Sequence, residues 1–293
     1  MMHCGFIGLG NIGKPMAENL AKKCATYDMA LTVFDVMPAP MADLAALGAS
    51  TANSPEDMAK QCELIGICVR NDDDVEQLLY GANGRDGMLK LGRPNAIFAI
   101  HSTVTRDNIV RWAADAKQHN IHVVDAPITG GAGGAAAGTL CIMLGASPEL
   151  SERLQPMLSC MASKLVAAGE PGAGTVLKLA NNLMNYTAFT AISEATALVK
   201  AAGVDVEKLF EVGEANGVIT PMAKQFVTGR DGLFSGCTKE EMFSIFGPFA
   251  GLAEKDLDHA LHLAAQLGLE FSVAKKVREG IHQTFLEVIT AKC

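Results

Sequence analysis

Three glycines near the amino terminus have the spacing that a dinucleotide-binding loop needs. Gly8, Gly10 and Gly13 follow an apolar stretch and precede a helical pattern. The first glycine allows a tight turn, the second lets the backbone approach a pyrophosphate, and the third lets helix and strand pack closely. The free amides of the helix N-terminus add positive potential. We therefore expect a pyrophosphate to lie against six residues: Gly8, Leu9, Gly10, Asn11, Ile12 and Gly13.

An acidic residue favours this interpretation over a purely structural glycine turn. Asp35 ends the second expected strand, where a carboxylate can accept hydrogen bonds from the two adenosine ribose hydroxyls. The residues after it, Val36, Met37 and Pro38, carry no positive charge that could offset repulsion of the extra phosphate of NADP. The sequence therefore predicts NAD, with NADP less favoured. The alternative is that Asp35 is only a solvated acid at a strand end.

Two further groups of residues could hold and convert a substrate. Thr129, followed by Gly130 and Gly131, can present a hydroxyl and consecutive amides to a carboxylate. A flexible glycine-rich connection fits the same residues equally well. Lys178 and Asn182 stand four residues apart, which places them on one face of a helix. Taken alone, that pair is read more simply as a solvated lysine beside an incidental asparagine.

Composition limits the classes of partner. A length of 293 residues with 49% hydrophobic and 19% charged residues allows a large core and two domains. The net charge of −8, without a basic run, argues against nucleic acid. No apolar stretch reaches the roughly 18 residues that span a bilayer, and no signal peptide is apparent, so we expect no membrane partner. Eight cysteines without a Cys-x-x-Cys motif predict neither a disulfide framework nor a metal site, and favour a cytoplasmic location.

The elements that must position these residues follow a βαβ pattern in the first part of the chain. Strands are expected over residues 3–7, 30–34, 64–69, 96–100, 122–124, 140–144 and 164–168. Helices are expected later, over residues 176–202, 206–215, 221–228, 249–267 and 272–289. We predict an α/β fold, with a Rossmann-type doubly wound, mostly parallel sheet in residues 1–168. An all-α domain in residues 169–293 follows it, and the long interdomain helix favours a homodimer or homotetramer.

Three segments resemble the β-hydroxyacid dehydrogenase family, which includes 3-hydroxyisobutyrate dehydrogenase and resembles 6-phosphogluconate dehydrogenase in fold. The glycine loop continues as Met16-Ala-Glu-Asn-Leu20, which is more specific than the glycines themselves. Residues 125–140 resemble the family's substrate loop, with Thr129 where Ser is usual. Residues 172–182 are similar to its catalytic helix.

The resemblance implies an oxidoreductase that transfers a hydride between NAD(H) and a short 3-hydroxy acid or its semialdehyde. Reduction leaves an alkoxide that needs a proton, so Lys178 would be the general acid/base and Asn182 would hold the substrate. Thr129, Gly130 and Gly131 would bind the substrate carboxylate. The resemblance also implies cofactor contacts for Val69, Arg70, Asn71, Thr103 and Lys255. No metal is required.

Several alternatives remain open. One is an NADPH-dependent reductase of glyoxylate or succinic semialdehyde, and another is a decarboxylating sugar-acid dehydrogenase. Asp35 disfavours NADPH, and the expected substrate loop lacks the basic cluster that suits a sugar phosphate. A third alternative is a non-catalytic dinucleotide sensor, against which Lys178 and Asn182 together argue. The chain also departs from the family at His101, where Asp is usual, and at Arg70.

Overall fold

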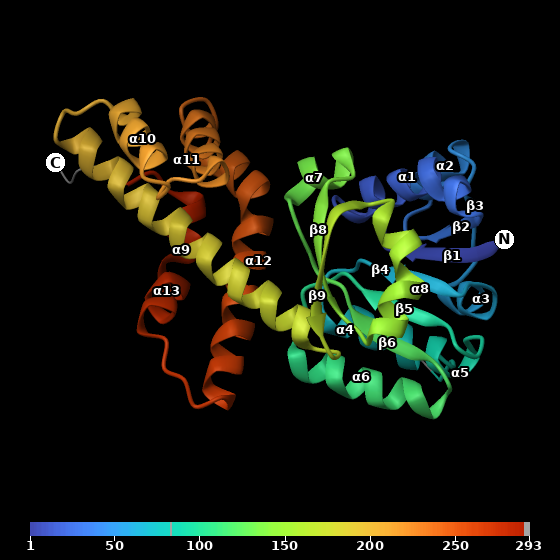
Figure 1. Cartoon of the computed structure of the whole chain (residues 1–293). Coiled ribbons are helices and arrows are strands. Elements are labelled where there is room, and N and C mark those ends of the chain that lie inside the picture. Colours follow the sequence, from blue (N-terminus) through green and yellow to red (C-terminus); the bar gives the residue numbers. More distant parts are fainter. Residues whose placement is uncertain (83, 290–293) are drawn as a thin grey trace. The chain divides into compact units, whose positions relative to one another are not determined.

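The structure, a computed structural model, describes residues 1–82 and 84–289 (Figure 1). The described residues form two compact units, the first covering Met1–Lys178 and the second beginning at Leu179. The first unit alternates strands with helices, and the second contains helices. The predicted α/β class, with a Rossmann-type sheet followed by an all-α domain, is thus confirmed.

One sheet organises the first unit. Within the described residues it has nine strands: β1 (Met2–Ile7), β2 (Met29–Phe34), β3 (Ser50–Thr51), β4 (Leu64–Ile67), β5 (Ile97–Ile100), β6 (His122–Asp125), β7 (Ile128–Thr129), β8 (Leu140–Gly145) and β9 (Ala162–Gly169). Their order is β3-β2-β1-β4-β5-β6-β8-β7, and β9 also pairs with β8. The strands from β3 to β6 are parallel, whereas β8 runs antiparallel to β6 and β7. The strand order reverses beside β1, where open α/β sheets bind ligands.

Helices cover both faces of this sheet. The first unit contains α1 (Gly13–Lys23), a short 3-10 turn (Cys24–Tyr27), α2 (Pro38–Ala46), α3 (Pro55–Gln61), α4 (Asp72–Tyr80), α5 (Met88–Leu91), α6 (Arg106–Gln118), α7 (Gly131–Ala137) and α8 (Pro148–Ser159). Helices α1, α2 and α8 pack into the core on one face, whereas α3, α4 and α6 pack into the core on the other. Because both faces are covered, β4 and β5 are buried along their whole length.

Side-chain caps define where several of these helices begin. Ser54, Asn71 and Thr105 accept hydrogen bonds from backbone amides in the first turns of α3, α4 and α6. At Ser54 the distance from the side-chain Oγ to the amide of Asp57 is 3.1 Å. These neutral caps satisfy amides that the helix itself leaves without a partner.

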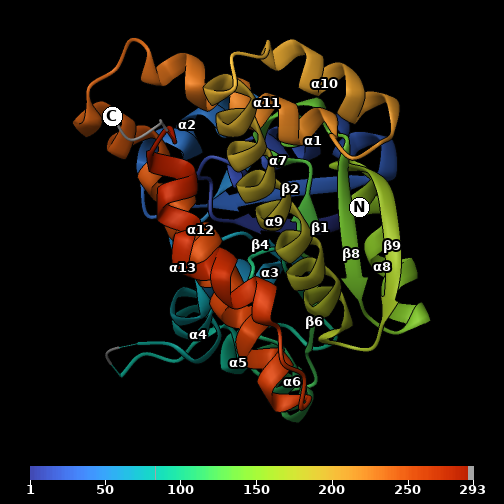
Figure 2. The same ribbon diagram turned by 90° about the vertical axis from the view of Figure 1, so that its left-hand side faces the viewer.

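The second unit is built from five helices within the described residues: the rest of α9 (Ala173–Ala201), α10 (Val206–Ala215), α11 (Pro221–Phe234), α12 (Lys239–Gln266) and α13 (Ser272–Leu286). Helices α12 and α13 lie side by side (Figure 2) and share a core. A second cluster joins α10 and α11 to α9, and the rings of Phe189 and Phe226 stack with centroids 4.3 Å apart. Apolar and aromatic burial therefore holds this unit together.

Two helices are longer than the sequence predicts. The helix expected to begin at residue 249 begins at Lys239, because Thr238 and Glu241 form a reciprocal capping box and Pro248 is accommodated inside the helix. The helix expected to end at residue 228 continues to Phe234 through two glycines. In both cases packing outweighs the local helix-breaking tendency of proline or glycine.

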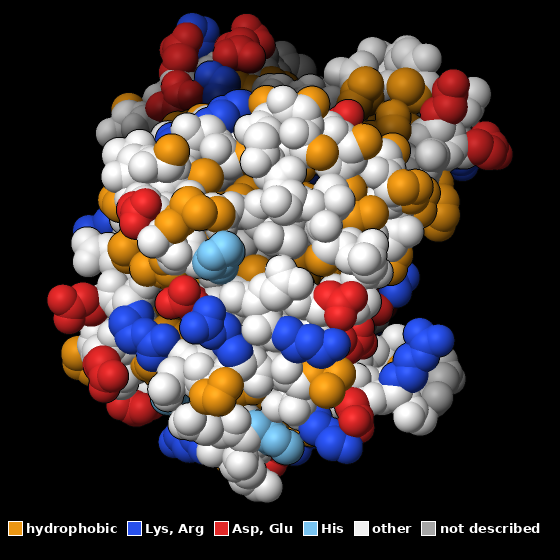
Figure 3. Space-filling view, turned by 90° about the vertical axis from the view of Figure 1, so that its right-hand side faces the viewer, with side chains coloured by type: hydrophobic (Ala, Val, Ile, Leu, Met, Phe, Trp, Pro, Cys, Tyr) orange, Lys and Arg blue, Asp and Glu red, His pale blue; other side chains and the backbone are white. Residues whose placement is uncertain are grey.

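The cysteines of the described residues form no disulfide bond. The seven cysteines among the described residues are free thiols. On the face shown in Figure 3, basic and acidic side chains lie interspersed rather than segregated. No helix in residues 1–82 and 84–289 combines the length and apolar character needed to cross a membrane.

Candidate cofactor and substrate site

The three glycines of the β1–α1 loop have different surroundings. Gly8 has a φ of 91°, and a Cβ placed there would lie 2.1 Å from the carbonyl oxygen of Cys68. A Cβ on Gly13 would lie 2.0 Å from the carbonyl oxygen of Gly8. Gly10 differs, because no atom of the described chain lies within 4 Å of where its Cβ would be. Gly8 and Gly13 therefore shape the turn, whereas Gly10 leaves open space for a ligand.

The N-terminus of α1 suits a phosphate. Its N-cap, Ile12, makes no side-chain cap hydrogen bond, and its first turn contains no acidic residue. The amide of Lys14 donates to the carbonyl oxygen of Gly10 at 3.0 Å, and the helix dipole favours negative charge at this end of the helix.

Asp35 lies directly beside this loop. Its Oδ2 accepts a hydrogen bond of 2.6 Å from the amide of Leu9, and its Oδ1 accepts one of 2.8 Å from the amide of Met37. Each carboxylate oxygen can accept a second hydrogen bond, so the group can still bind ribose hydroxyls. These features fit an adenine dinucleotide: an open glycine, an uncapped helix and a fixed acid.

The segment after β4 is also fixed. The amide of Val69 donates to Ser102 Oγ at 2.9 Å, and the Ser102 hydroxyl donates to the Val69 carbonyl at 2.8 Å. Asn71 serves as the N-cap of α4. The side chain of Arg70 forms two hydrogen bonds with Asp74, at 2.8 and 2.7 Å. This pairing provides a local role for Arg70, which the sequence left unexplained.

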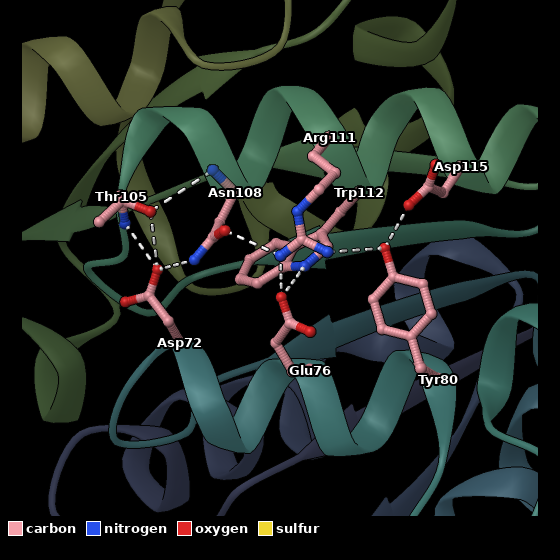
Figure 4. A network of polar contacts seen from close by, with 8 residues as sticks. All are labelled: Asp72, Glu76, Tyr80, Thr105, Asn108, Arg111, Trp112 and Asp115. Carbon is pink, nitrogen blue, oxygen red and sulfur yellow. Dashed lines mark hydrogen bonds and ion pairs between the residues drawn. The ribbon is translucent and has the colours of Figure 1, made fainter. Parts of the chain in front are cut away.

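A polar network joins α4 to α6 (Figure 4), and it includes Thr105, two residues after Thr103. Asp72 Oδ1 accepts hydrogen bonds from the amide and hydroxyl of Thr105, each at 2.9 Å, and from Asn108 at 2.6 Å. Glu76 accepts from the indole of Trp112 at 3.0 Å and pairs with Arg111. The two helices that follow the expected cofactor-binding segments are therefore tied together along their length.

The predicted substrate loop turns sharply at two glycines. Gly130 and Gly131 have φ values of 124° and 62°, and nothing described lies within 4 Å of a Cβ on Gly131. Positive φ values of this kind let consecutive amides face one side, which suits an anion. Thr129 ends β7 opposite Cys141, so its backbone is held by β8.

Asn19, in the segment that follows the glycine loop, joins α1 to α7. Its Nδ2 lies 2.9 Å from the carbonyl oxygen of Ala135 and 3.1 Å from that of Ala136, at the carboxyl end of α7. Gly138 leaves no room for a side chain, since a Cβ there would lie 2.7 Å from Asn19 Oδ1. Helix α1 thus holds α7, the helix that follows the predicted substrate loop.

His101 has a structural role at the end of β5. It is buried, stacks on Phe6, and its Nδ1 lies 2.8 Å from the carbonyl oxygen of Ala126. Because a carbonyl only accepts, the proton must be on Nδ1. Its Nε2 is buried with no hydrogen-bond partner among the described residues. Burial lowers the pKa of His101 to about 4, so the ring is neutral at physiological pH.

Lys178 lies in the second turn of α9, within the first unit. The start of this helix is bound by Asp125, which accepts hydrogen bonds from the amides of Gly172 at 2.7 Å and Thr175 at 2.6 Å. Asp125 is itself the first residue of the segment that leads to Thr129. One carboxylate therefore contacts the helix of the predicted general acid/base and begins the predicted substrate loop.

Asn182 lies one turn further along α9 and belongs to the second unit. Its Nδ2 donates to Asp256 Oδ2 at 2.6 Å. Asp256 is 5% exposed, and it also accepts from Tyr186 at 3.1 Å and pairs with Lys255 at 2.9 Å. The structure thus groups two predicted residues, Asn182 and Lys255, around an acid that the sequence analysis did not single out.

Within residues 1–82 and 84–289, no group of three or more histidine, cysteine or acidic side chains is arranged to hold a metal ion.

The fold and the glycine loop define a dinucleotide-binding oxidoreductase, and two family models cover almost the whole chain. Residues 3–169 match the NAD-binding domain of 6-phosphogluconate dehydrogenase. Residues 172–290 match the model described as NAD-binding of NADP-dependent 3-hydroxyisobutyrate dehydrogenase. The chain belongs to the β-hydroxyacid dehydrogenase family, whose members bind NAD or NADP.

Individual relatives span nearly the same length. An uncharacterized oxidoreductase of Mycobacterium tuberculosis is 36% identical over 277 residues, which cover 92% of this chain and 89% of the relative. The 2-(hydroxymethyl)glutarate dehydrogenase of Eubacterium barkeri is 34% identical, with coverages of 92% and 83%. The solved structure of 3-hydroxyisobutyrate dehydrogenase from M. tuberculosis matches with a TM-score of 0.81 at 24% identity, covering 98% and 97% of the two chains. This last comparison supports the fold.

Three residues that shape the site were not assigned a role from sequence. Asn19, Asp125 and Asp256 act by holding other residues, and each does so across a long stretch of sequence. A partial signal existed for the acids, since an ionisable residue inside an apolar run needs a partner when it is buried. The identity of that partner depends on the fold.

Proposed function

We propose that this protein is an NAD-dependent dehydrogenase of a short 3-hydroxy acid, which it interconverts with the corresponding semialdehyde. Lys178 is the general acid/base, and Asn182 binds the hydroxyl end of the substrate. The observation that carries this proposal is the fixed amide of Asn182. It lies one turn after Lys178 on the same helix, and a buried carboxylate 2.6 Å away sets its orientation.

The preference for NAD over NADP rests on charge. Asp35 is anchored by the amides of Leu9 and Met37, so its negative charge stays where a 2′-phosphate would approach. The nearby Lys14 is paired with Asp43 at 2.7 Å. Arg70, which follows β4, is paired with Asp74. Lys14 and Arg70 therefore already have acidic partners.

The substrate class follows from the loop at Thr129, Gly130 and Gly131. Its open glycine and positive φ values suit a small carboxylate, and the Thr129 hydroxyl adds a donor. Bound NADH supplies a hydride, or NAD accepts one. In the reductive direction Lys178 Nζ donates a proton to the oxygen that becomes the alcohol, and in the oxidative direction it takes that proton back.

The activity test is a change in nicotinamide absorbance with a panel of short hydroxy acids and semialdehydes, run with both NADH and NADPH. We expect turnover with at least one 3-hydroxy acid or semialdehyde and a preference for NADH. Lys178→Ala should abolish turnover while largely sparing NADH binding. Near-normal turnover in that variant would refute the assignment.

The same panel separates the alternatives. Strong preference for NADPH with glyoxylate or succinic semialdehyde would favour the reductase alternative. Tight NADH binding without any turnover would favour a dinucleotide sensor.

We further propose a division of labour between residues 1–168, which bind the dinucleotide, and residues 169–293, which complete the substrate site and join subunits. Two apolar side chains of α9, Met184 and Leu198, are 65% and 71% exposed, as expected for a helix that a second copy covers. Sedimentation of the wild-type protein should reveal a dimer or tetramer, and Leu198→Glu should shift it toward the monomer.

A further inference from the structure

Asp125 is a fully buried carboxylate at the junction of three elements. It ends β6, lies opposite Gly145 of β8, and binds two amides at the start of α9. Its two oxygens take different partners, Gly172 for Oδ1 and Thr175 for Oδ2. The side chain thus accepts from the α9 segment at two points, which fixes the direction of the helix start as well as its position.

Two glycines make room for this carboxylate. A Cβ on Gly145 would lie 2.1 Å from Asp125 Oδ1. A Cβ on Gly174 would lie 3.0 Å from Asp125 Oδ2 and 2.3 Å from the carbonyl oxygen of Met143. Neither position can accept a side chain without displacing the carboxylate or the neighbouring backbone. The helix start and β8 are therefore packed closely around this one group.

Helix capping alone does not explain an acid here. Neutral side chains, Ser54, Asn71 and Thr105, cap α3, α4 and α6 in the same unit. Burial raises the pKa of Asp125, although the hydrogen bonds from Gly172 and Thr175 oppose that shift. A buried carboxylate is harder to accommodate than a neutral capping side chain. The two hydrogen bonds of Asp125 to the α9 segment therefore need an explanation other than helix capping.

The segment that follows Asp125 is fixed as firmly as the helix start. The carbonyl oxygen of Ala126 is bound by His101 at 2.8 Å, and that of Pro127 accepts from the amide of Met143 at 2.9 Å. Thr129 comes four residues after Asp125, and Lys178 comes one helical turn after Thr175. Short, restrained stretches of chain therefore connect both residues to the same carboxylate.

We propose that Asp125 is a positioning residue that sets the placement of Lys178 relative to the substrate loop at Thr129, Gly130 and Gly131. It acts through the backbone of α9 and does not touch the substrate. This inference rests on the proposed function, because it assumes that Lys178 transfers the proton.

The first test variant is Asp125→Asn, which keeps the size of the side chain. Its amide nitrogen is a donor and must face either the Gly172 or the Thr175 amide, which is also a donor, so one of the two bonds is lost. We expect kcat to fall by about 10²-fold, since small misplacements of a catalytic group have effects of that size. The dissociation constant for NADH should stay within about twofold, because the β1–α1 loop is unchanged. Amide exchange in the first turn of α9 should become faster.

A second variant, Gly145→Ala, leaves the carboxylate chemically intact but pushes it from its place. It should reproduce the kcat loss and the exchange pattern. The matched control is Ser54→Ala, which removes a helix cap in the same unit remote in sequence from the proposed site residues. Its unfolding midpoint should fall while kcat is maintained, which separates loss of stability from loss of positioning.

The outcomes are distinguishable. A drop in kcat with NADH binding retained in Asp125→Asn supports the proposal, and the same pattern in Gly145→Ala adds to that support. Wild-type kcat in Asp125→Asn, or a kcat change no larger than that of Ser54→Ala, overturns it. Equal loss of kcat and of NADH affinity also overturns it, because the effect is then on the whole unit. Turnover retained by Lys178→Ala removes the proposed function itself, whatever the Asp125 variants do.

Discussion

Asp256 accepts a hydrogen bond of 2.6 Å from the side-chain amide of Asn182, 74 residues away in the sequence. The same carboxylate oxygen accepts from Tyr186, and the other oxygen pairs with Lys255. An asparagine side chain can rotate by half a turn and exchange its donor for its acceptor. The buried acid removes that ambiguity, so Asn182 presents a defined face.

Replacing Asp256 should therefore impair the substrate site more than the fold. In Asp256→Asn the buried group keeps its size but loses its charge, and we expect kcat/KM for the substrate to fall by about 10²-fold. The free energy of unfolding should decrease by about 1–3 kcal/mol, as for a buried polar group that loses a partner. Steady-state kinetics and denaturant unfolding measure the two effects. Tyr186→Phe is the control, because it removes the hydroxyl that donates to Asp256 at 3.1 Å and leaves the shorter bond from Asn182 in place. An equal loss of kcat/KM in that variant would contradict the role of Asn182.

Cofactor preference should depend on the charge at the end of β2. The double substitution Asp35→Ser and Val36→Arg removes the acid and adds a cation beside the expected 2′-phosphate position. Val36 is 86% exposed, so the longer side chain fits without repacking. We expect the ratio of kcat/KM for NADH over NADPH to fall by at least about tenfold. An unchanged ratio would mean that Asp35 does not face the ribose.

Gly8 and Gly10, two of the three glycines of the β1–α1 loop, should behave differently when each is replaced by alanine. Gly10→Ala meets no atom of the described chain, so stability should be retained while NADH affinity falls by at least about tenfold. Gly8→Ala combines a positive φ with a clash against the Cys68 carbonyl, and should lower the free energy of unfolding by at least about 1–3 kcal/mol. Thermal unfolding with and without NADH distinguishes them. If both variants lose stability equally, Gly10 is part of the turn and not of the ligand site.

The buried histidine predicts an acid-dependent loss of stability. The pKa of His101 in the folded protein is about 4, below its ordinary value of 6.5. The unfolded state therefore binds the proton first as pH falls, and the folded state loses stability between pH 6.5 and 4. The contribution is about 3 kcal/mol across that range, from 1.36 kcal/mol per pKa unit.

The matched variant is His101→Asn, whose side-chain amide can still donate to Ala126 but does not titrate. Denaturant unfolding from pH 7 to 4 should show a smaller loss of stability in this variant than in the wild type. Parallel curves for the two proteins would count against a depressed pKa.

The glycine motif could be recognised, and the class of the fold predicted, because their signals are local. Gly8, Gly10 and Gly13 lie close together in the sequence, and the βαβ pattern repeats at short spacing. The acids that hold the substrate residues could not be assigned in this way. Asp125 meets its partners 47 and 50 residues later, and Asp256 meets Asn182 across 74 residues. Such pairings depend on which helices and strands the fold brings together.

Helix ends were predictable where a capping side chain stands at the boundary, as at Ser54. They were misplaced where packing carried a helix through a residue that usually breaks it, as at Pro248. Arg70 also gained its explanation only from the fold, which places it beside Asp74 in the first turn of α4. In each case the missing information was a packing arrangement or a contact that only the folded structure shows.

The hydrogen bonds from Asn19 to the carboxyl end of α7 have a practical consequence for engineering. These hydrogen bonds join α1 to the carboxyl end of α7, the helix that follows the proposed substrate loop. A graft of the glycine loop from another dehydrogenase should therefore carry Asn19 and Gly138 together, since separating that pair would change substrate affinity even if every nucleotide contact were kept.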